Sequence, residues 1–390
     1  MQHFSIEERR ARLGVRHHLA ATAKRADVVE VAADLIGLHG TDPATVFLAA
    51  AARMKKPTVE RIERTLYDDR TIVRMLAMRR TLFVVPTEFV PMVQAGASNA
   101  IAARERIRLV QWIEASGIAA NGDRWLRKAE IATLEALRTH GAGTAAELAK
   151  HVPLLREQIR VGAGKWQATT GVGTRVLLVL AAEGRIARGR PRGSWLSTQH
   201  RWEAMESWIP GGVTSIGIDD ARAELVTRWL RSFGPATVAD LKWWTGWTLG
   251  ETRNALARVD AVEVDLDGAV GVALADDLET TTPVKPWAAL LPALDPTAMG
   301  WTERGWYLGE HRPALFDRSG NVGPTVWWNG RVVGGWAQRA DGEIVTRLLE
   351  AAGKDVTAAV NAEAGRLETW LADRRFIPRF RTPLEIELVS

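Results

Sequence analysis

The sequence predicts a mainly α-helical fold with β-hairpins, in which tandem winged-helix units are followed by a C-terminal β-rich region. A helical stripe of apolar residues over 174–183 is followed at once by two short runs with strand character. The segment GAGTAAELAK at 141–150 is matched by GPATVADLKW at 234–243, which indicates an internal repeat. Beyond about residue 276, alternating apolar residues predict strands. A helix followed directly by a small hairpin is the outline of a winged-helix unit.

Residues 1–95 are expected to form an N-terminal winged-helix-like domain. Helical spacing of apolar residues predicts helices over 27–38, 44–54 and 59–69. A strand-like run that ends at Pro86 follows these helices. The order of helices and then a strand relates this part to the units farther along the chain.

Residues 96–205 are expected to contain linking helices and a second, basic winged-helix domain. Gly184 stands where a helix C-cap is expected, because glycine adopts the left-handed conformation that ends many helices. The turn signal at 190–193 then joins the two strands of a hairpin. This hairpin begins with several arginines and with no acidic residue between 184 and 193.

Residues 206–275 are expected to form a third winged-helix domain. Both copies of the repeat pair a threonine with a carboxylate three residues later, which is typical of a helix N-terminus. Asp267-Gly268, between alternating apolar residues, predicts a hairpin turn. Glu263 and Asp265 make this hairpin acidic, and acidic side chains repel a phosphate backbone. We therefore interpret the third unit as mainly architectural.

Residues 276–390 are expected to form a C-terminal β-rich region with a terminal helix. The run 324–336 predicts a hairpin with Asn329-Gly330 as its turn, because this dipeptide favours the tight turns that join antiparallel strands. Apolar residues at helical spacing place the last helix at about 341–373.

Composition excludes several classes of protein. The chain of 390 residues contains no cysteine, which excludes disulfides, cysteine metal sites and thiol nucleophiles. Its eight histidines show no metal-ligand spacing, and we expect neither a metal nor a cofactor. No apolar run is long enough to span a bilayer, and the first residues lack the apolar core of a signal peptide. We expect a cytoplasmic, nucleoid-associated monomer without a membrane partner.

The net charge of +5 is unevenly distributed along the chain. Residues 1–200 contain 31 Lys and Arg against 19 Asp and Glu, a net charge of +12. Residues 201–390 contain 20 against 27, a net charge of −7. A basic front half and an acidic rear half predict that one part of the molecule holds a polyanion and the other does not.

Arginines on a projecting hairpin suit contact with phosphates or entry into a minor groove. We therefore expect double-stranded DNA as the partner. The alternative is a solvated turn whose arginines only maintain solubility. The candidate DNA-contacting residues are three on the hairpin and three secondary positions elsewhere: Arg188, Arg190, Arg192, Arg79, Arg80 and Arg175.

Four segments, in this order along the chain, resemble the AlkZ/YcaQ family of winged-helix DNA glycosylases. They are GLHGTDPATVFLAAAARM (37–54), MRRTLFVVP (78–86), SFGPATVADLKWWTG (232–246) and FDRSGNVGPTVWWNGRVVGGW (316–336). The resemblance covers nearly the whole chain and implies tandem winged-helix units that form a curved, basic channel. It also implies an enzyme that removes bulky N-alkylated purines, including interstrand crosslinks, without a metal or cofactor. Such activity serves DNA repair or resistance to genotoxins.

The family's catalytic motif is Gln-Φ-Gln or Gln-Φ-Asp, where Φ is apolar, and the matching positions here are His39-Gly40-Thr41. A neutral His39 could accept a proton from the attacking water, and the Thr41 hydroxyl could hold the same water. Asp42 could supply electrostatic stabilisation or act as an alternative base. Structural roles stay open as well. Thr41 or Asp42 could be the N-cap of a helix that begins at Pro43, and His39 could satisfy a buried carbonyl.

Two alternatives to a glycosylase remain at this point. One is a DNA-binding protein of the same fold that has lost catalysis and shields or senses lesions. The other is a winged-helix transcription regulator. Regulators commonly bind palindromic sites as dimers, whereas this chain shows no dimerisation helix and repeats the winged unit within one chain.

Overall fold

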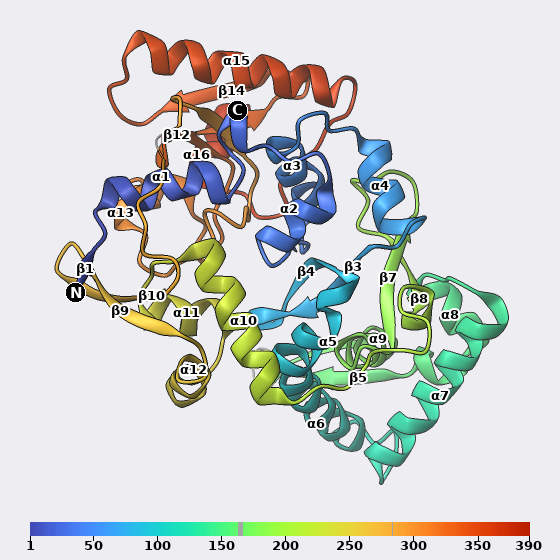
Figure 1. The fold of residues 1–390 in the computed structure, drawn as a ribbon. Coiled ribbons are helices and arrows are strands. Elements are labelled where there is room, and N and C mark those ends of the chain that lie inside the picture. The colour runs from blue at the N-terminus through green and yellow to red at the C-terminus, as the bar shows by residue number, and fades with distance from the viewer. Residues whose placement is uncertain (163–166, 283) are drawn as a thin grey trace. The chain divides into compact units, whose positions relative to one another are not determined.

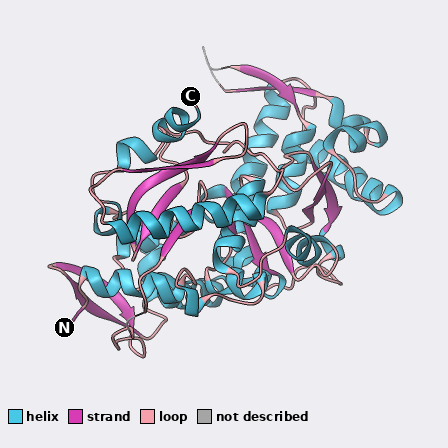
Figure 2. Ribbon diagram, turned by 90° about the horizontal axis from the view of Figure 1, so that it is seen from above, coloured by secondary structure: helices cyan, strands magenta, loops and turns pink. Residues whose placement is uncertain are grey.

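The computed structural model describes residues 1–162, 167–282 and 284–390. Helices alternate with several small sheets, most of whose strand pairs are antiparallel, as Figure 2 shows. The predicted combination of helices and hairpins is therefore confirmed at the level of a mixed α+β fold. One of the sheets is a four-stranded antiparallel sheet in the C-terminal part, where the sequence predicts a β-rich region.

The chain divides into two compact units, which Figure 1 shows with the chain coloured from blue to red. Unit 1 consists of Met1–Thr65 and Arg222–Ser390, and unit 2 consists of Leu66–Ala221. The division of the chain into four consecutive domains stays a prediction. Helices α4 (Val59–Tyr67) and α10 (Ile218–Phe233) contain the two boundaries between the units.

Unit 2 contains the segment that the sequence predicts to be basic. Its remaining helices and strands are β3 (Ile72–Ala77), β4 (Thr81–Pro86), α5 (Val90–Val93), α6 (Asn99–Ala115), α7 (Gly122–His140), α8 (Ala145–His151), β5 (Gln158–Val161), β6 (Ala168–Gly171), α9 (Gly173–Ala182), β7 (Ile186–Pro191) and β8 (His200–Ala204). Apolar side chains of α6, α7, α8 and α9 form its main core. α9 is central to this core, because it packs against α6 and also against β3.

The predicted helix and hairpin at 174–205 are present as α9, β7 and β8, but the connection is longer than predicted. β7 ends at Pro191 and β8 begins only at His200. The Ser194 and Ser197 hydroxyls accept hydrogen bonds from the backbone two residues later, at 3.3 and 3.1 Å. Serine side chains compete with a strand ladder in this way and favour turns.

Unit 1 combines the N-terminal helices with the C-terminal half. Its remaining helices and strands are β1 (Gln2–His3), α1 (Ile6–Arg16), α2 (Val28–Asp34), β2 (Leu38–His39), α3 (Pro43–Arg53), α11 (Val238–Thr245), α12 (Leu249–Leu256), β9 (Ala261–Leu266), β10 (Ala269–Leu274), β11 (Ala288–Leu291), α13 (Gly305–Leu308), α14 (Arg312–Leu315), β12 (Thr325–Trp328), β13 (Arg331–Gln338), β14 (Ile344–Leu348), α15 (Lys354–Leu371) and α16 (Pro383–Val389). The four-stranded sheet has the order β11-β12-β13-β14, and α15 packs along β11 and β14.

Two hairpin turns are confirmed where the sequence predicts them. Asp267-Gly268 joins β9 to β10, and Asn329-Gly330 joins β12 to β13, with positive φ at all four residues. The prediction of one helix over 341–373 is wrong at its start, because β14 occupies the first part and pairs with β13. β14 contains β-branched side chains, and these fit a pleated surface better than a helix.

Two segments have the same order of elements. In the first, α7, α8 and α9 precede the hairpin β7–β8, and Gly143 between the first two helices bridges to Trp202. In the second, α10, α11 and α12 precede β9–β10, and Ala236 bridges to Val272. The helices after these bridge residues both begin with the predicted threonine capping box. The shared order agrees with the internal repeat in the sequence.

A buried ion pair fastens α3 inside unit 1. The Arg53 guanidinium donates to both carboxylate oxygens of Asp295, at 2.8 and 2.7 Å, and neither side chain is exposed. Arg53 also donates to the carbonyl of His17 at 3.1 Å and to the hydroxyl of Thr297 at 2.8 Å. The end of α1, the end of α3 and the loop after β11 therefore meet at one guanidinium.

The His17 side chain completes this cluster and is fully buried. Its ring nitrogens lie 2.8 Å from the Thr297 hydroxyl and 3.2 Å from the Ser232 carbonyl. Burial and then the charge of Arg53 hold the pKa of His17 well below its ordinary value. In unit 2, burial and the charges of Arg74 and Arg188 lower the pKa of His200 to about 2.

Breaking the Arg53–Asp295 pair is expected to destabilise unit 1 strongly. Asp295→Asn or Arg53→Met should lower the free energy of unfolding by about 3–5 kcal/mol, because the remaining partner is left buried without compensation. Urea unfolding followed by tryptophan fluorescence measures the change. Arg138→Gln, which breaks an exposed pair with Glu135, is the control and should cost less than about 1 kcal/mol. A loss of similar size in both variants would contradict the assigned role.

Stability is expected to fall below about pH 6.5 because of the two buried histidines. Each binds a proton readily in the unfolded chain, whereas its lowered pKa prevents protonation in the folded chain. Each should therefore remove up to about 1.4 kcal/mol of stability per pH unit as the pH decreases. His200→Gln should reduce this slope in urea unfolding. An identical slope in wild type and His200→Gln would contradict the account.

Candidate active site and nucleic-acid interface

The candidate catalytic segment lies between β2 and α3. His39 ends β2 and is only 4% exposed. Its Nδ1 atom accepts a hydrogen bond from the backbone N–H of Thr41 at 3.4 Å, which is long for such a bond. In this arrangement Nδ1 carries the lone pair of a neutral ring, and the ring hydrogen is on Nε2. To accept a proton at Nδ1, the imidazole must therefore first give up this weak hydrogen bond from the Thr41 backbone.

Asp42 is the N-cap of α3, which confirms the structural alternative that the sequence offers for this residue. One carboxylate oxygen accepts from the N–H of Ala44 at 3.0 Å, and the other accepts from the N–H of Arg379 at 2.9 Å. The Thr41 carbonyl is also 3.5 Å from the guanidinium of Arg379. The carboxylate is therefore fixed in position by two backbone donors from distant parts of unit 1.

The three predicted hairpin arginines do not lie on one face. Arg188 is cross-strand from Trp202, and its guanidinium is 5.2 Å from the centre of that ring. Arg190 donates to both carboxylate oxygens of Asp68, at 2.8 and 3.0 Å. The reason is an irregularity in the pairing of β7 with β8 between Arg188 and Pro191, because a bulge interrupts the alternation of side chains along a strand.

Arg188 and Arg192 line one cavity of about 440 Å³ in unit 2. His200 and Trp202 from β8 form another part of its wall. Arg192 is more than half exposed and lies 3.3 Å from the carboxylate of Glu147. Of the hairpin arginines, this pair is the one best placed to meet a phosphate together.

The secondary candidates are engaged in contacts within unit 2. Arg79 and Arg80 form the turn between β3 and β4, and both have positive φ. Arg80 binds both carboxylate oxygens of Glu105, at 2.7 and 3.0 Å. Arg175 on α9 lies 5.5 Å from the centre of the Trp112 ring. These contacts give Arg80 and Arg175 structural roles within the unit.

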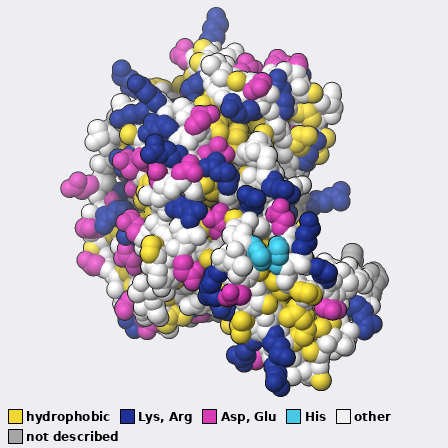
Figure 3. Space-filling model, turned by 90° about the vertical axis from the view of Figure 1, so that its right-hand side faces the viewer, with side chains coloured by type: hydrophobic (Ala, Val, Ile, Leu, Met, Phe, Trp, Pro, Cys, Tyr) yellow, Lys and Arg dark blue, Asp and Glu magenta, His cyan; other side chains and the backbone are white. Residues whose placement is uncertain are grey.

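The basic character of the front half is concentrated in unit 2. Unit 2 contains 21 Lys and Arg against 15 Asp and Glu, a net charge of +6, whereas unit 1 contains 30 against 31, a net charge of −1. On the face shown in Figure 3, Lys and Arg side chains are interspersed with Asp and Glu side chains. Phosphates would therefore compete with carboxylates for many of these arginines.

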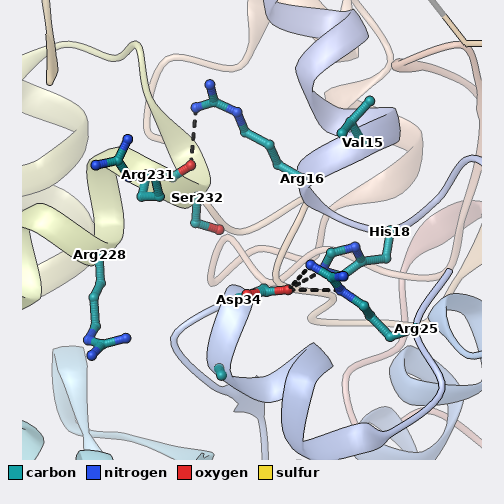
Figure 4. Close-up of a pocket in the computed structure, with 9 residues that line it drawn as sticks. Val15, Arg16, His18, Arg25, Asp34, Arg228, Arg231 and Ser232 are labelled. Atoms are coloured by element: carbon teal, nitrogen blue, oxygen red, sulfur yellow. Dashed lines mark hydrogen bonds and ion pairs between the residues drawn. The ribbon is translucent and has the colours of Figure 1, made fainter. Parts of the chain in front are cut away.

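Another cluster of arginines, which the sequence does not indicate, lies in unit 1. Arg16, Arg25, Arg228 and Arg231 line a cavity of about 300 Å³, drawn in Figure 4. They come from the end of α1, from the segment before α2 and from α10. No signal in the sequence connects these positions, because about 200 residues separate the first two from the last two.

The part of the chain that the structure describes contains no group of three or more histidine, aspartate or glutamate side chains arranged to hold a metal ion. None of its helices combines the length and the apolar character that a membrane span requires.

The family to which the chain belongs follows from a match to a family model. The model of the family described as DNA glycosylase AlkZ-like matches residues 32–370. The chain belongs to the AlkZ-like DNA glycosylase family. The matched range begins within α2 and ends within α15, so it includes both the candidate catalytic segment and the basic hairpin.

A solved structure supports the same fold for this AlkZ-like chain. The DNA glycosylase AlkZ of Streptomyces sahachiroi is 21% identical and superposes with a TM-score of 0.74. The match covers 96% of this chain and 98% of the other. Among curated protein sequences, none matches the chain significantly.

Removing the cavity-lining arginines of the AlkZ-like hairpin is expected to weaken binding to duplex DNA. Arg188→Gln with Arg192→Gln should lower affinity about tenfold or more and reduce the slope of log affinity against log salt by about two, one for each lost phosphate contact. Arg190→Gln should have a smaller effect, because Arg190 is not among the residues that line this cavity. Fluorescence anisotropy at several salt concentrations measures both quantities.

Arg138→Gln on α7 is the matched control, since it removes an exposed arginine of the same unit outside the hairpin. An unchanged affinity and salt slope in the double variant would show that the hairpin does not contact DNA.

Proposed function

We propose that this chain is a monofunctional DNA glycosylase that excises bulky N-alkylated purines from duplex DNA without a metal or cofactor. The observation that carries the proposal is the family match over residues 32–370, which covers most of the chain. In this role the protein would serve DNA repair or resistance to genotoxins, with interstrand crosslinks among its substrates.

We also infer that the two segments with a common order of elements are winged-helix units. Three helices, a bridging residue and a hairpin correspond to the parts of such a unit in each case. In the first segment the hairpin β7–β8 would act as the DNA-contacting wing, since the helix before it, α9, is mostly buried in the core. The acidic hairpin β9–β10 would serve architecture, because Asp265 and Asp267 bind His3 and the backbone N–H of Ile6.

The chemistry requires little from the protein. An N7-alkylated guanine carries a positive charge and leaves as a neutral base, so the reaction needs no strong general acid. It needs an oriented water and stabilisation of a sugar with oxocarbenium character. A segment fixed by backbone hydrogen bonds suits this task, since preorganised groups need no rearrangement during reaction.

His39 is the proposed acceptor of the proton from the attacking water. Its Nδ1 atom accepts a 3.4 Å hydrogen bond from the Thr41 backbone, and a water bound more closely would replace that bond. The Thr41 hydroxyl is the proposed second anchor for the same water.

Asp42 is better suited to electrostatic stabilisation than to proton transfer. The two backbone N–H groups that bind it hold its charge at the N-terminus of α3. The helix dipole favours a negative charge in that position. A negative charge held in this position would stabilise the positive charge that develops on the sugar, without any rearrangement.

A second candidate function is DNA binding without catalysis, in which the protein shields or senses lesions. The observation that favours it is the identity of the motif. His39-Gly40-Thr41 contains neither glutamine of the family motif, and Asp42 has the structural contacts of a helix N-cap.

The test is excision from a duplex that carries one bulky N7-guanine adduct, with hot alkali to cleave the abasic product. Under single-turnover conditions His39→Ala should slow excision about a hundredfold or more if His39 is the base. Its DNA affinity should change little, because the contact is made in the transition state. Excision should also slow at acid pH, since protonated imidazole cannot accept a proton.

Asp42→Asn separates the two roles of Asp42, because asparagine caps helices as well as aspartate but carries no charge. A slower reaction at unchanged stability would support the electrostatic role. Wild-type rates in both His39→Ala and Asp42→Asn would show that this segment is structural. The absence of excision by the wild type on such adducts would favour the binding function.

A further inference from the structure

The cavity of about 300 Å³ in unit 1 is bounded by the end of α1, by α2 and by α10. Figure 4 shows Arg16, Arg228 and Arg231 on one side and Arg25 with His18 and Asp34 on the other. Asp34 is the only carboxylate among the residues that line it. The lining itself therefore contains more basic than acidic side chains, and the carboxylates that pair with Arg16, Arg228 and Arg231 are not part of it.

The single carboxylate is already compensated. One oxygen of Asp34 accepts from Nε and Nη2 of Arg25, at 3.1 and 2.8 Å, and from Nε2 of His18 at 2.8 Å. The other ring nitrogen of His18 lies 3.1 Å from the carbonyl of Ala23. Both ring nitrogens face acceptor oxygens, and the Asp34 carboxylate is shared between His18 and Arg25. Asp34 thus does not neutralise the remaining arginines.

Arg16 is held in place by three hydrogen-bond acceptors. Its guanidinium donates to the carbonyls of Arg231 and Gly234, at 3.1 and 3.0 Å, and to Asp277 at 2.6 Å. Burial, with Arg12 and Arg231 nearby, lowers the pKa of Arg16. Arg12 and Arg231 thus place further positive charge near Arg16, where the carboxylate of Asp277 opposes their effect on its pKa.

Arg228 and Arg231 have partners that an anion could replace. Arg228 pairs with Glu224 and Arg231 with Asp276, and each carboxylate is about half exposed or more. Exposed pairs of this kind contribute little to stability. Both guanidiniums can therefore leave their carboxylates and bind a ligand with only a small loss of stability.

Ser232 supplies independent evidence for a ligand. Its side chain lines the cavity, and the residue is only 6% exposed. Within the described residues its hydroxyl has no hydrogen-bond partner. A buried hydroxyl without a partner is costly, and an acceptor oxygen in the cavity would satisfy it.

We propose that this cavity binds a phosphate group, through Arg228, Arg231 and the hydroxyl of Ser232, with Arg16 as the fixed charge behind them. Guanidinium groups match the oxygen geometry of phosphate. The volume lies at the lower end of the range for ligand sites and suits a phosphate with part of a sugar. The phosphate can come from a free phosphate compound or from a DNA backbone. The second source rests on the proposed function.

Isothermal titration of the full chain with inorganic phosphate at constant ionic strength tests the site without DNA. Saturable one-site binding is expected. Arg228→Gln with Arg231→Gln should weaken it about tenfold or more, and Ser232→Ala about fivefold, as expected for charged and neutral hydrogen bonds. Arg253→Gln, an exposed arginine of unit 1 outside the cavity, is the control and should leave it unchanged.

Duplex-DNA binding by the same double variant identifies the source. A salt slope that falls by about one assigns the site to a backbone phosphate, and an unchanged slope with lost phosphate binding assigns it to a free phosphate compound. Two results overturn the site. One is phosphate binding that the double variant retains, and the other is no saturable phosphate binding together with an unchanged slope. Failure of the wild type to excise adducts would count against the proposed function only.

Discussion

The bidentate bond between Arg53 and Asp295 is the constraint on which unit 1 depends. It joins α3 near the N-terminus to the loop after β11, 242 positions away, and it is fully buried. Because a buried charge must be paired, this bond can form only when the first 65 residues and the C-terminal half fold together. The candidate catalytic segment immediately precedes α3. The position of the candidate catalytic segment is therefore set by α3, a helix that is buried along its whole length.

Local features of this fold could be predicted from the sequence, whereas long-range ones could not. Threonine caps and the Asp267-Gly268 turn depend on neighbours within four residues, and both are where the sequence predicts them. The parallel pairing of β1 with β9 brings Gln2 beside Val264. No local sequence pattern predicts this pairing. At the site, the Asp42 cap was predictable from Pro43, but its second bond to Arg379 was not. The irregularity after Arg188 likewise separated Arg190 from the other hairpin arginines.

Arginine serves two purposes in this protein, and the structure separates them. Arg53, Arg80 and Arg106 are bound to buried carboxylates and hold elements together. Arg192 and Arg231 are more exposed and have partners that water reaches. Only arginines of the second kind can exchange a carboxylate for a phosphate at small cost. A count of basic residues therefore overstates the surface that is available to a polyanion.

The central claim is that chemistry takes place at His39–Asp42 although both family glutamines are absent. The most direct measurement is the single-turnover excision rate of a variant that restores them, His39→Gln with Thr41→Gln, beside a variant with alanine at both positions. A glutamine amide can also orient a water, so the account predicts that the glutamine variant excises at least as fast as the wild type. The alanine variant should be slower by about a hundredfold or more. Equal rates in wild type and both variants would contradict the claim.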